Sequence, residues 1–306
     1  MLPLHSRPSV SATITQIKNI LTRTSGYLKT VTSHSIQPYR GCTFGNALCG
    51  VGCYVRHNGH ITQGRPWGSF LEVRENAAAS YLEHAPRERR WARGSRGKFS
   101  IFLSSSTDPF LPQESRYRVT RSLLEAMLDV PPDELVLQSH TGRVADEFDR
   151  IASLRSCTDV RLHLSIETDR EHISGLPPHA SPIDERFAAA EAARNLGIQT
   201  VITVAPLLPI ADPESFFARV ARCADAVVID HFIEGDGTPD GRRTLQTALP
   251  AAIRALEPAA LGLNYRDQIV RIAERHLPGR VGVGIDGFAG RYRTPSAKQV
   301  PSPDQL

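Results

Sequence analysis

Short apolar runs rich in β-branched residues alternate along this chain with longer segments whose apolar residues recur at helical spacing. This alternation is typical of successive β-α units around a parallel sheet. Strands are predicted at residues 35–39, 99–104, 134–139, 160–166, 199–205 and 226–231. Helices are predicted at residues 68–83, 116–128, 144–154, 184–196, 213–223 and 249–256. The pattern therefore predicts an α/β fold with six β-α units.

The remaining segments set the expected domain boundaries. Two further apolar stretches, at 260–263 and 281–285, could add closing strands. Residues 87–98 contain five arginines and a lysine, and we expect a loop there because the segment is rich in glycine and charge. The expected organisation is an N-terminal extension over 1–34, one barrel domain over 35–290, and a flexible polar tail over 291–306.

Composition excludes several classes of protein. Hydrophobic residues make up 41% of the 306 residues and charged residues 22%, which is an ordinary globular composition. No apolar run approaches the roughly 18 residues that a membrane span needs, and the first residues lack a secretory signal pattern. We therefore expect a cytoplasmic protein without membrane association. A formal net charge of +4 permits a polyanionic partner without requiring one.

Three of the five cysteines, Cys42, Cys49 and Cys53, fall within twelve residues. They follow the first predicted strand in a glycine-rich loop, and barrel enzymes place catalytic groups at the carboxyl ends of their strands. Thiolates are the usual ligands of iron-sulfur clusters. Three cysteines in place of four would leave one iron open to a substrate or cofactor.

The same residues permit a second interpretation as a structural zinc site. Cys42, Cys49, Cys53 and His57 form a C-x6-C-x3-C-x3-H array, which is an acceptable Cys3His tetrahedron. The alternative hypothesis is a zinc-containing nucleic-acid-binding protein without catalysis. Metal analysis would separate the two hypotheses, because a cluster brings iron, sulfide and a visible absorption.

Several motifs in unbroken order over roughly residues 35–235 resemble one enzyme family. They are YRGCT at 39–43, CYVR at 53–56, TDPFLPQE at 107–114, LSIET at 164–168, the segment 178–186, and VAPLLP at 204–209. With these motifs the chain resembles radical S-adenosylmethionine enzymes, specifically the branch similar to spore photoproduct lyase. The resemblance implies a partial (β/α)6 TIM-type barrel of the radical S-adenosylmethionine kind.

The resemblance also implies the chemistry. It implies a 4Fe-4S cluster on Cys42, Cys49 and Cys53 that cleaves S-adenosylmethionine reductively, giving a 5'-deoxyadenosyl radical that abstracts hydrogen from a substrate. An electron donor such as flavodoxin or ferredoxin would be a partner. In spore photoproduct lyase-like enzymes a cysteine near the second strand end returns hydrogen to the product radical. This chain has serines at 104–106 instead, which argues against the same lesion repair.

The cysteine spacing departs from the family pattern. The family has three residues between its first two cysteines and two between the next pair, whereas this chain has six and three. On the usual spacing the second ligand would fall at Asn46. Because the residues after Cys53 match those that follow the family's third cysteine, we take Cys49 and Cys53 as the second and third ligands. An interpretation in which Asn46 marks an inactive site stays open.

The resemblance assigns the cofactor contacts to residues near the strand ends. These are Tyr54, Ser104, Ser105, Thr107, Ser139, Ser165, Glu167 and Arg186. Glu167 is expected to bind ribose hydroxyls. Relatives often have a lysine where this chain has Ser139, so recognition of the cofactor carboxylate is expected from Arg186 or His140. Each serine could alternatively satisfy a backbone group at a strand end or helix cap.

The substrate stays open among a nucleic acid, a peptide or protein side chain, and a small metabolite. A nucleic acid is favoured by the resemblance and by the cations that surround Trp91 in the basic segment 87–98, which suit phosphates and base stacking. The alternative is a solvated loop whose charges serve solubility only.

Overall fold

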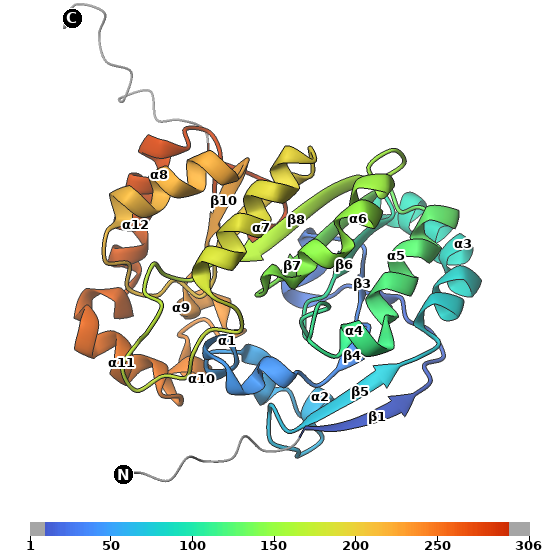
Figure 1. Ribbon diagram of the computed structural model, residues 1–306, viewed down its shortest axis with the longest axis horizontal. Coiled ribbons are helices and arrows are strands. Elements are labelled where there is room, and N and C mark those ends of the chain that lie inside the picture. The colour runs from blue at the N-terminus through green and yellow to red at the C-terminus, as the bar shows by residue number, and fades with distance from the viewer. Residues whose placement is uncertain (1–9, 294–306) are drawn as a thin grey trace, which may run out of the picture.

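In a computed structural model, which describes residues 10–293, an eight-stranded sheet occupies the centre of the molecule (Figure 1). The strands lie in the order β11-β10-β9-β8-β7-β6-β3-β2. Their bounds are β2 Thr22–Arg23, β3 His34–Ile36, β6 Ser100–Leu103, β7 Glu134–Ser139, β8 Asp159–Ser165, β9 Gln199–Val204, β10 Ala226–Ile229 and β11 Val281–Val283. Adjacent strands from β3 to β11 are parallel, whereas β2 is antiparallel to β3. The six predicted strands are confirmed, and the stretch at 281–285 supplies a seventh parallel strand.

Helices cover the outer face of this sheet (Figure 1). They are α3 Ala77–Arg96, α5 Val119–Asp129, α6 Phe148–Leu154, α7 Ile183–Asn195, α8 Pro213–Cys223 and α12 Leu263–His276. Leu135 and Leu137 of β7 belong to the large core between sheet and helices. Val136 belongs to a second, smaller core with Val201 and Val228 of other strands. Both faces are therefore buried, and the sheet is an open barrel with its own interior.

A second sheet of three strands was not predicted. It joins β1 Ser11–Thr15, β5 Phe70–Arg74 and β4 Tyr39–Arg40 in the order β1-β5-β4. The prediction of a helix from residue 68 was wrong over its first part, where β5 lies. The chain extends there because Leu71 and Val73 pack in the main core while Glu72 between them is only half-buried and pairs with Arg40 and Arg65.

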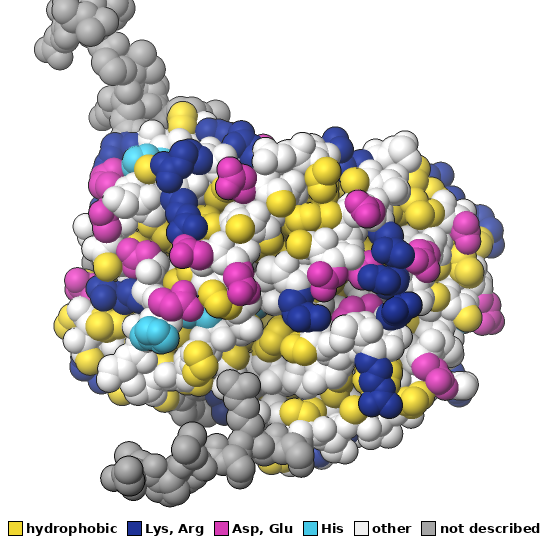
Figure 2. Space-filling model, in the orientation of Figure 1, with side chains coloured by type: hydrophobic (Ala, Val, Ile, Leu, Met, Phe, Trp, Pro, Cys, Tyr) yellow, Lys and Arg dark blue, Asp and Glu magenta, His cyan; other side chains and the backbone are white. Residues whose placement is uncertain are grey.

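The basic segment 87–98 is not a loop, and that prediction was wrong. Its residues 87–96 are the second half of α3, whose buried residues recur every three or four positions, with Ser80 and Tyr81 adjacent: Ala77, Ser80, Tyr81, Ala85, Glu88 and Ala92. This spacing places one continuous stripe against the barrel. Several of the cations are engaged by the protein: Arg87 pairs with Glu88, Arg93 with Asp133 and Lys98 with Glu134. On the face of the molecule that Figure 2 shows, basic and acidic side chains are likewise interspersed.

Trp91 is likewise not presented to a ligand. It is partly buried against the core, and the guanidinium of Arg23 stacks on its ring at 3.9 Å. The segment is therefore helical, and its binding of nucleic acid stays a prediction.

Two other expectations concern the C-terminal third. The closing strand predicted at 260–263 was wrong, because these residues form the 3-10 helix Pro258–Leu261 and lead into α12. Glu257 caps that turn by accepting a hydrogen bond from the backbone N–H of Ala259 at 3.1 Å. Most of the predicted tail, from residue 294 onward, lies outside the described residues. Within the part described, none of the helices has both the length and the apolar character needed to cross a bilayer.

Candidate functional site

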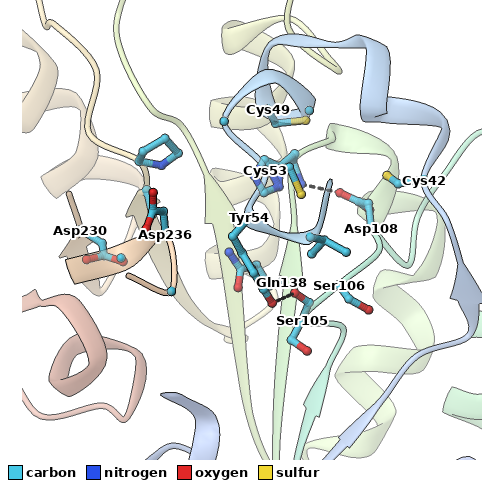
Figure 3. A pocket seen from close by; sticks show the side chains of 18 of the residues that line it. Cys42, Cys49, Cys53, Tyr54, Ser105, Ser106, Asp108, Gln138, Asp230 and Asp236 are labelled. Carbon is cyan, nitrogen blue, oxygen red and sulfur yellow. Dashed lines mark hydrogen bonds between the residues drawn. The ribbon is translucent and has the colours of Figure 1, made fainter. Parts of the chain in front are cut away.

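The three clustered cysteines line one cavity of about 260 Å³. Cys42 follows β4, Cys49 lies in the short helix α1 Leu48–Val51, and Cys53 precedes the 3-10 turn Tyr54–His57. In Figure 3 the three thiols lie on the same side of the cavity. The structure therefore brings together the residues that were predicted to hold a cluster.

Glycines and Asn46 give the loop its tight path. Gly41 has a φ of +83°, and a Cβ there would stand 2.3 Å from the carbonyl oxygen of Phe70. A Cβ on Gly50 would stand 2.3 Å from the carbonyl oxygen of Gly45. The side-chain amide of Asn46 donates to the carbonyl oxygen of Gly68 at 3.0 Å. Asn46 thus anchors the longer loop, while Cys49 and Cys53 line the cavity.

The thiols lie in a poorly solvated environment. Burial raises the pKa of Cys42 to about 12, that of Cys53 to about 11 and that of Cys49 well above its usual range. A metal centre would supply the positive charge that keeps such thiols deprotonated. Three thiols distributed along one wall suit an iron-sulfur cluster, which is larger than a single ion.

The zinc interpretation finds less support in the geometry. Over residues 10–293 no three His, Cys, Asp or Glu side chains are grouped to hold a single metal ion. His57 is exposed and does not line the cavity. Burial lowers the pKa of His57, as do the charges of Arg56 and Arg243. The charged groups that act on His57 are therefore Arg56, Arg243 and Asp236.

Facing the cysteine loop, the predicted serine segment after β6 also lines the cavity. Gln37 holds it: the Gln37 side-chain oxygen accepts from the Ser104 hydroxyl, from the Ser106 N–H at 3.1 Å and from the Ser106 hydroxyl at 2.8 Å. The Gln37 amide donates to the Ser105 hydroxyl at 2.9 Å. Sequence reasoning missed Gln37, which sits immediately after β3.

Two further predicted residues join the serine segment to the cysteine loop. The Tyr54 hydroxyl donates to the Ser105 carbonyl at 2.5 Å (Figure 3), and the Thr107 hydroxyl donates to the Gly41 carbonyl at 2.9 Å. Both residues line the cavity.

Four predicted residues are buried behind the cavity and do not line it: Ser139, Ser165, Glu167 and Arg186. The Arg186 guanidinium donates to Glu167 at 2.9 Å and to the Ser165 carbonyl at 2.5 Å. The Ser139 hydroxyl donates to Asp108 at 3.1 Å. Their assignment as cofactor contacts stays a prediction.

His140 connects this buried group to the cavity. It lines the cavity, and its Nε2 lies 3.5 Å from Oε1 of Glu167. That oxygen is otherwise buried without a hydrogen-bond partner among the described residues. Of the two residues expected to recognise the cofactor carboxylate, His140 faces the cavity and Arg186 does not.

Sequence reasoning also missed polar residues that point into the barrel from strand ends. Gln138 lies two residues after Val136, and Asp230 lies two residues after Val228, and both valines are in the interior core. Because side chains alternate along a strand, Gln138 and Asp230 face the same interior. Both line the cavity (Figure 3). The period-two pattern places each of them on the same face as its valine, but only the fold shows that this face is the interior.

Comparison with known sequences gives limited information. No protein-family model matches the chain. An uncharacterized protein, ORF301 of Acidianus two-tailed virus, is 28% identical over 152 residues, which are 49% of this chain and 46% of that protein. The match thus spans about half the length of the viral relative.

Comparison with solved structures identifies the fold. A spore photoproduct lyase double mutant with bound AdoMet and dinucleoside spore photoproduct superposes with a TM-score of 0.60 and 17% identity, over 89% of this chain and 81% of that one. A single mutant of spore photoproduct lyase superposes with a TM-score of 0.63 and 14% identity, over 92% and 87%. The chain therefore has the fold of spore photoproduct lyase, as the sequence motifs predicted.

Proposed function

We propose that this chain, with the fold of spore photoproduct lyase, is a radical S-adenosylmethionine enzyme that carries a 4Fe-4S cluster on Cys42, Cys49 and Cys53. The observation that carries the proposal is the convergence of these thiols on one wall of a cavity at the strand ends of that fold. The donor set fits the cluster chemically, because three thiolates leave a fourth iron free for a cofactor.

The chain's own residues would bind and orient the cofactor. Ser104 and Ser105 present small hydroxyls that permit close approach, and Gln37 fixes them. Tyr54 closes over this segment from the cysteine loop. When bound, the cluster supplies the electron that cleaves S-adenosylmethionine reductively for hydrogen abstraction. The protein's part is to orient the cofactor and to exclude water.

Anaerobic reconstitution with iron and sulfide tests the proposal. The reconstituted protein should show the broad visible absorption of a cluster. After reduction with dithionite it should convert S-adenosylmethionine into 5'-deoxyadenosine and methionine, measured by chromatography. A fully loaded cluster without cleavage would contradict the proposed activity and favour an inactive site.

His140 is expected to recognise the carboxylate of the cofactor, since of the two candidates it is the one that faces the cavity. His140→Ala should weaken S-adenosylmethionine binding about tenfold, or about 1.4 kcal/mol, because a charge-assisted hydrogen bond is lost. Isothermal titration calorimetry on the reconstituted protein measures the effect. The control is His172→Ala, which removes an exposed histidine that does not line the cavity. Equal affinity in both variants would remove His140 from the cofactor site.

A further inference from the structure

The cavity has a second end, away from the cysteines. Figure 3 shows Asp230 and Asp236 on one side and the three thiols with Asp108 on the other, with Tyr54 and Gln138 between them. A cofactor bound at the thiols would leave the Asp230 side for the molecule that the radical attacks.

The charge of the cavity is unusual for a site that would bind phosphate. No lysine or arginine is among its lining residues in the described part of the chain, whereas three aspartates are. His231 adds no positive charge, because its Nε2 donates to the Ala260 carbonyl while its Nδ1 accepts from the Ile233 N–H, which makes it a neutral tautomer. His140 lies at the thiol end, where its backbone N–H donates to Asp108. An anion entering at the Asp230 end would therefore meet carboxylates without a cation among the lining side chains.

Two of the three carboxylates are already satisfied by the protein. Asp236 accepts the backbone N–H groups of Thr238 at 2.9 Å and Thr244 at 2.8 Å. Asp108 accepts the backbone N–H groups of Phe110 at 2.9 Å and His140 at 2.6 Å. These two aspartates hold turns in place and have little capacity left for a ligand.

Asp230 differs from them. Among the described residues, its carboxylate accepts a hydrogen bond from the backbone N–H of His231 and a long one of 3.4 Å from the Tyr27 hydroxyl. Because a carboxylate can accept about four hydrogen bonds, about half of this capacity is left for a ligand. Burial raises the pKa of Asp230 to about 7, because the hydrogen bonds from His231 and Tyr27 and the charge of Arg266 offset the burial only in part.

Aromatic side chains surround the Asp230 end. The rings of Tyr27 and Phe288 meet edge to face with centroids 6.1 Å apart, and Phe232 also lines the cavity. Aromatic faces attract cations through their quadrupole, and the attraction grows when the cation is shielded from water. A carboxylate among aromatic rings is therefore a site for a positively charged or strongly donating nitrogen group.

We propose that Asp230 binds the substrate of this cavity, and that the substrate presents a cationic nitrogen group, an amine, amidine or guanidine, and no phosphate at this end. The inference rests on the proposed function only where it identifies the bound molecule as the substrate of the radical reaction. The binding site itself follows from the cavity, so its test does not need cofactor cleavage.

Three aromatic probes of equal size test the inference on reconstituted, S-adenosylmethionine-saturated protein: benzamidine, neutral benzamide and phenyl phosphate. Calorimetry should give the tightest binding for benzamidine, at least tenfold weaker binding for benzamide, and none for phenyl phosphate. Asp230→Asn should lower the benzamidine affinity at least tenfold. Asp286→Asn, which removes a carboxylate outside the cavity lining that is paired with Arg291, should not change it.

Four outcomes would overturn the inference. Phenyl phosphate could bind as tightly as benzamidine, benzamidine could bind the wild type and Asp230→Asn equally tightly, or benzamidine could fail to bind the wild type. Alternatively, Asp230→Asn could lower the affinity for S-adenosylmethionine itself tenfold, which would assign Asp230 to the cofactor. If this variant fails to fold, comparing the affinities of the wild type for benzamidine and for phenyl phosphate still tests whether the site prefers a cation to a phosphate. Failure of reductive cleavage, with benzamidine binding intact, would refute the proposed function but leave the cation site.

Discussion

Replacing Cys42, Cys49 and Cys53 together with alanine is expected to abolish the visible absorption of the reconstituted protein and its cleavage of S-adenosylmethionine. The three thiols lie on one wall of the cavity, so their removal leaves no thiolate there to hold iron. Iron and sulfide content per chain, together with the absorption spectrum, measures the effect. Far-ultraviolet circular dichroism should confirm that the barrel still folds.

Two matched variants test whether the loss of iron is specific to these three thiols. Cys157→Ala removes an exposed cysteine and should leave the iron content unchanged. His57→Ala should also leave it unchanged, whereas a Cys3His zinc site would lose its metal. Normal iron content in the triple variant would show that the cluster, if present, has other ligands.

The second large effect is expected on stability. Glu167→Ala should lower the free energy of unfolding by about 3–5 kcal/mol, because it leaves Arg186 buried without its ion-pair partner. Both side chains are only 1% exposed, and their closest atoms are 2.9 Å apart. Urea denaturation of the wild type and the variant measures the difference.

The pH dependence follows from the same ion pair. Burial by itself raises the pKa of Glu167, but the charges of Arg186, His140 and His179 outweigh it and hold the pKa at about 2, below its ordinary 4.5. The folded-state pKa is depressed, so the stabilisation is present above about pH 4.5 and is lost as the pH falls toward 2. The difference between wild type and Glu167→Ala should therefore shrink as the pH falls below 4.5.

An exposed ion pair provides the control for this prediction. Glu214 pairs with Arg275 and His276 at the surface, and Glu214→Ala should have little effect on unfolding because such pairs contribute little. If Glu167→Ala unfolds like the wild type but binds S-adenosylmethionine more weakly, Glu167 would contact the cofactor ribose, as the resemblance implied. Loss of stability with unchanged cofactor affinity would assign it to the buried ion pair.

The sequence alone determined the local features that depend on neighbouring residues. The six parallel strands could be predicted because each is a short apolar run followed by a segment of helical periodicity. The cysteine loop could be located because Cys42, Cys49 and Cys53 are close in the sequence and follow a strand. The second half of α3 was missed because its charges were given more weight than the spacing of Tyr81, Ala85 and Ala92.

Only the tertiary structure decided which polar residues face the cavity. In an open barrel both faces of each strand are buried, so polarity does not distinguish the helix side from the interior. Ser165 and Glu167 follow the same pattern as cavity residues, yet they pack against Thr203 and Arg186 behind it. Asp230 looks like an ordinary strand-end aspartate until the curvature of the sheet brings β10 opposite the cysteine loop. Contacts between residues far apart in the chain, such as Tyr27 with Phe288, shape this end of the cavity, and local sequence patterns do not encode them.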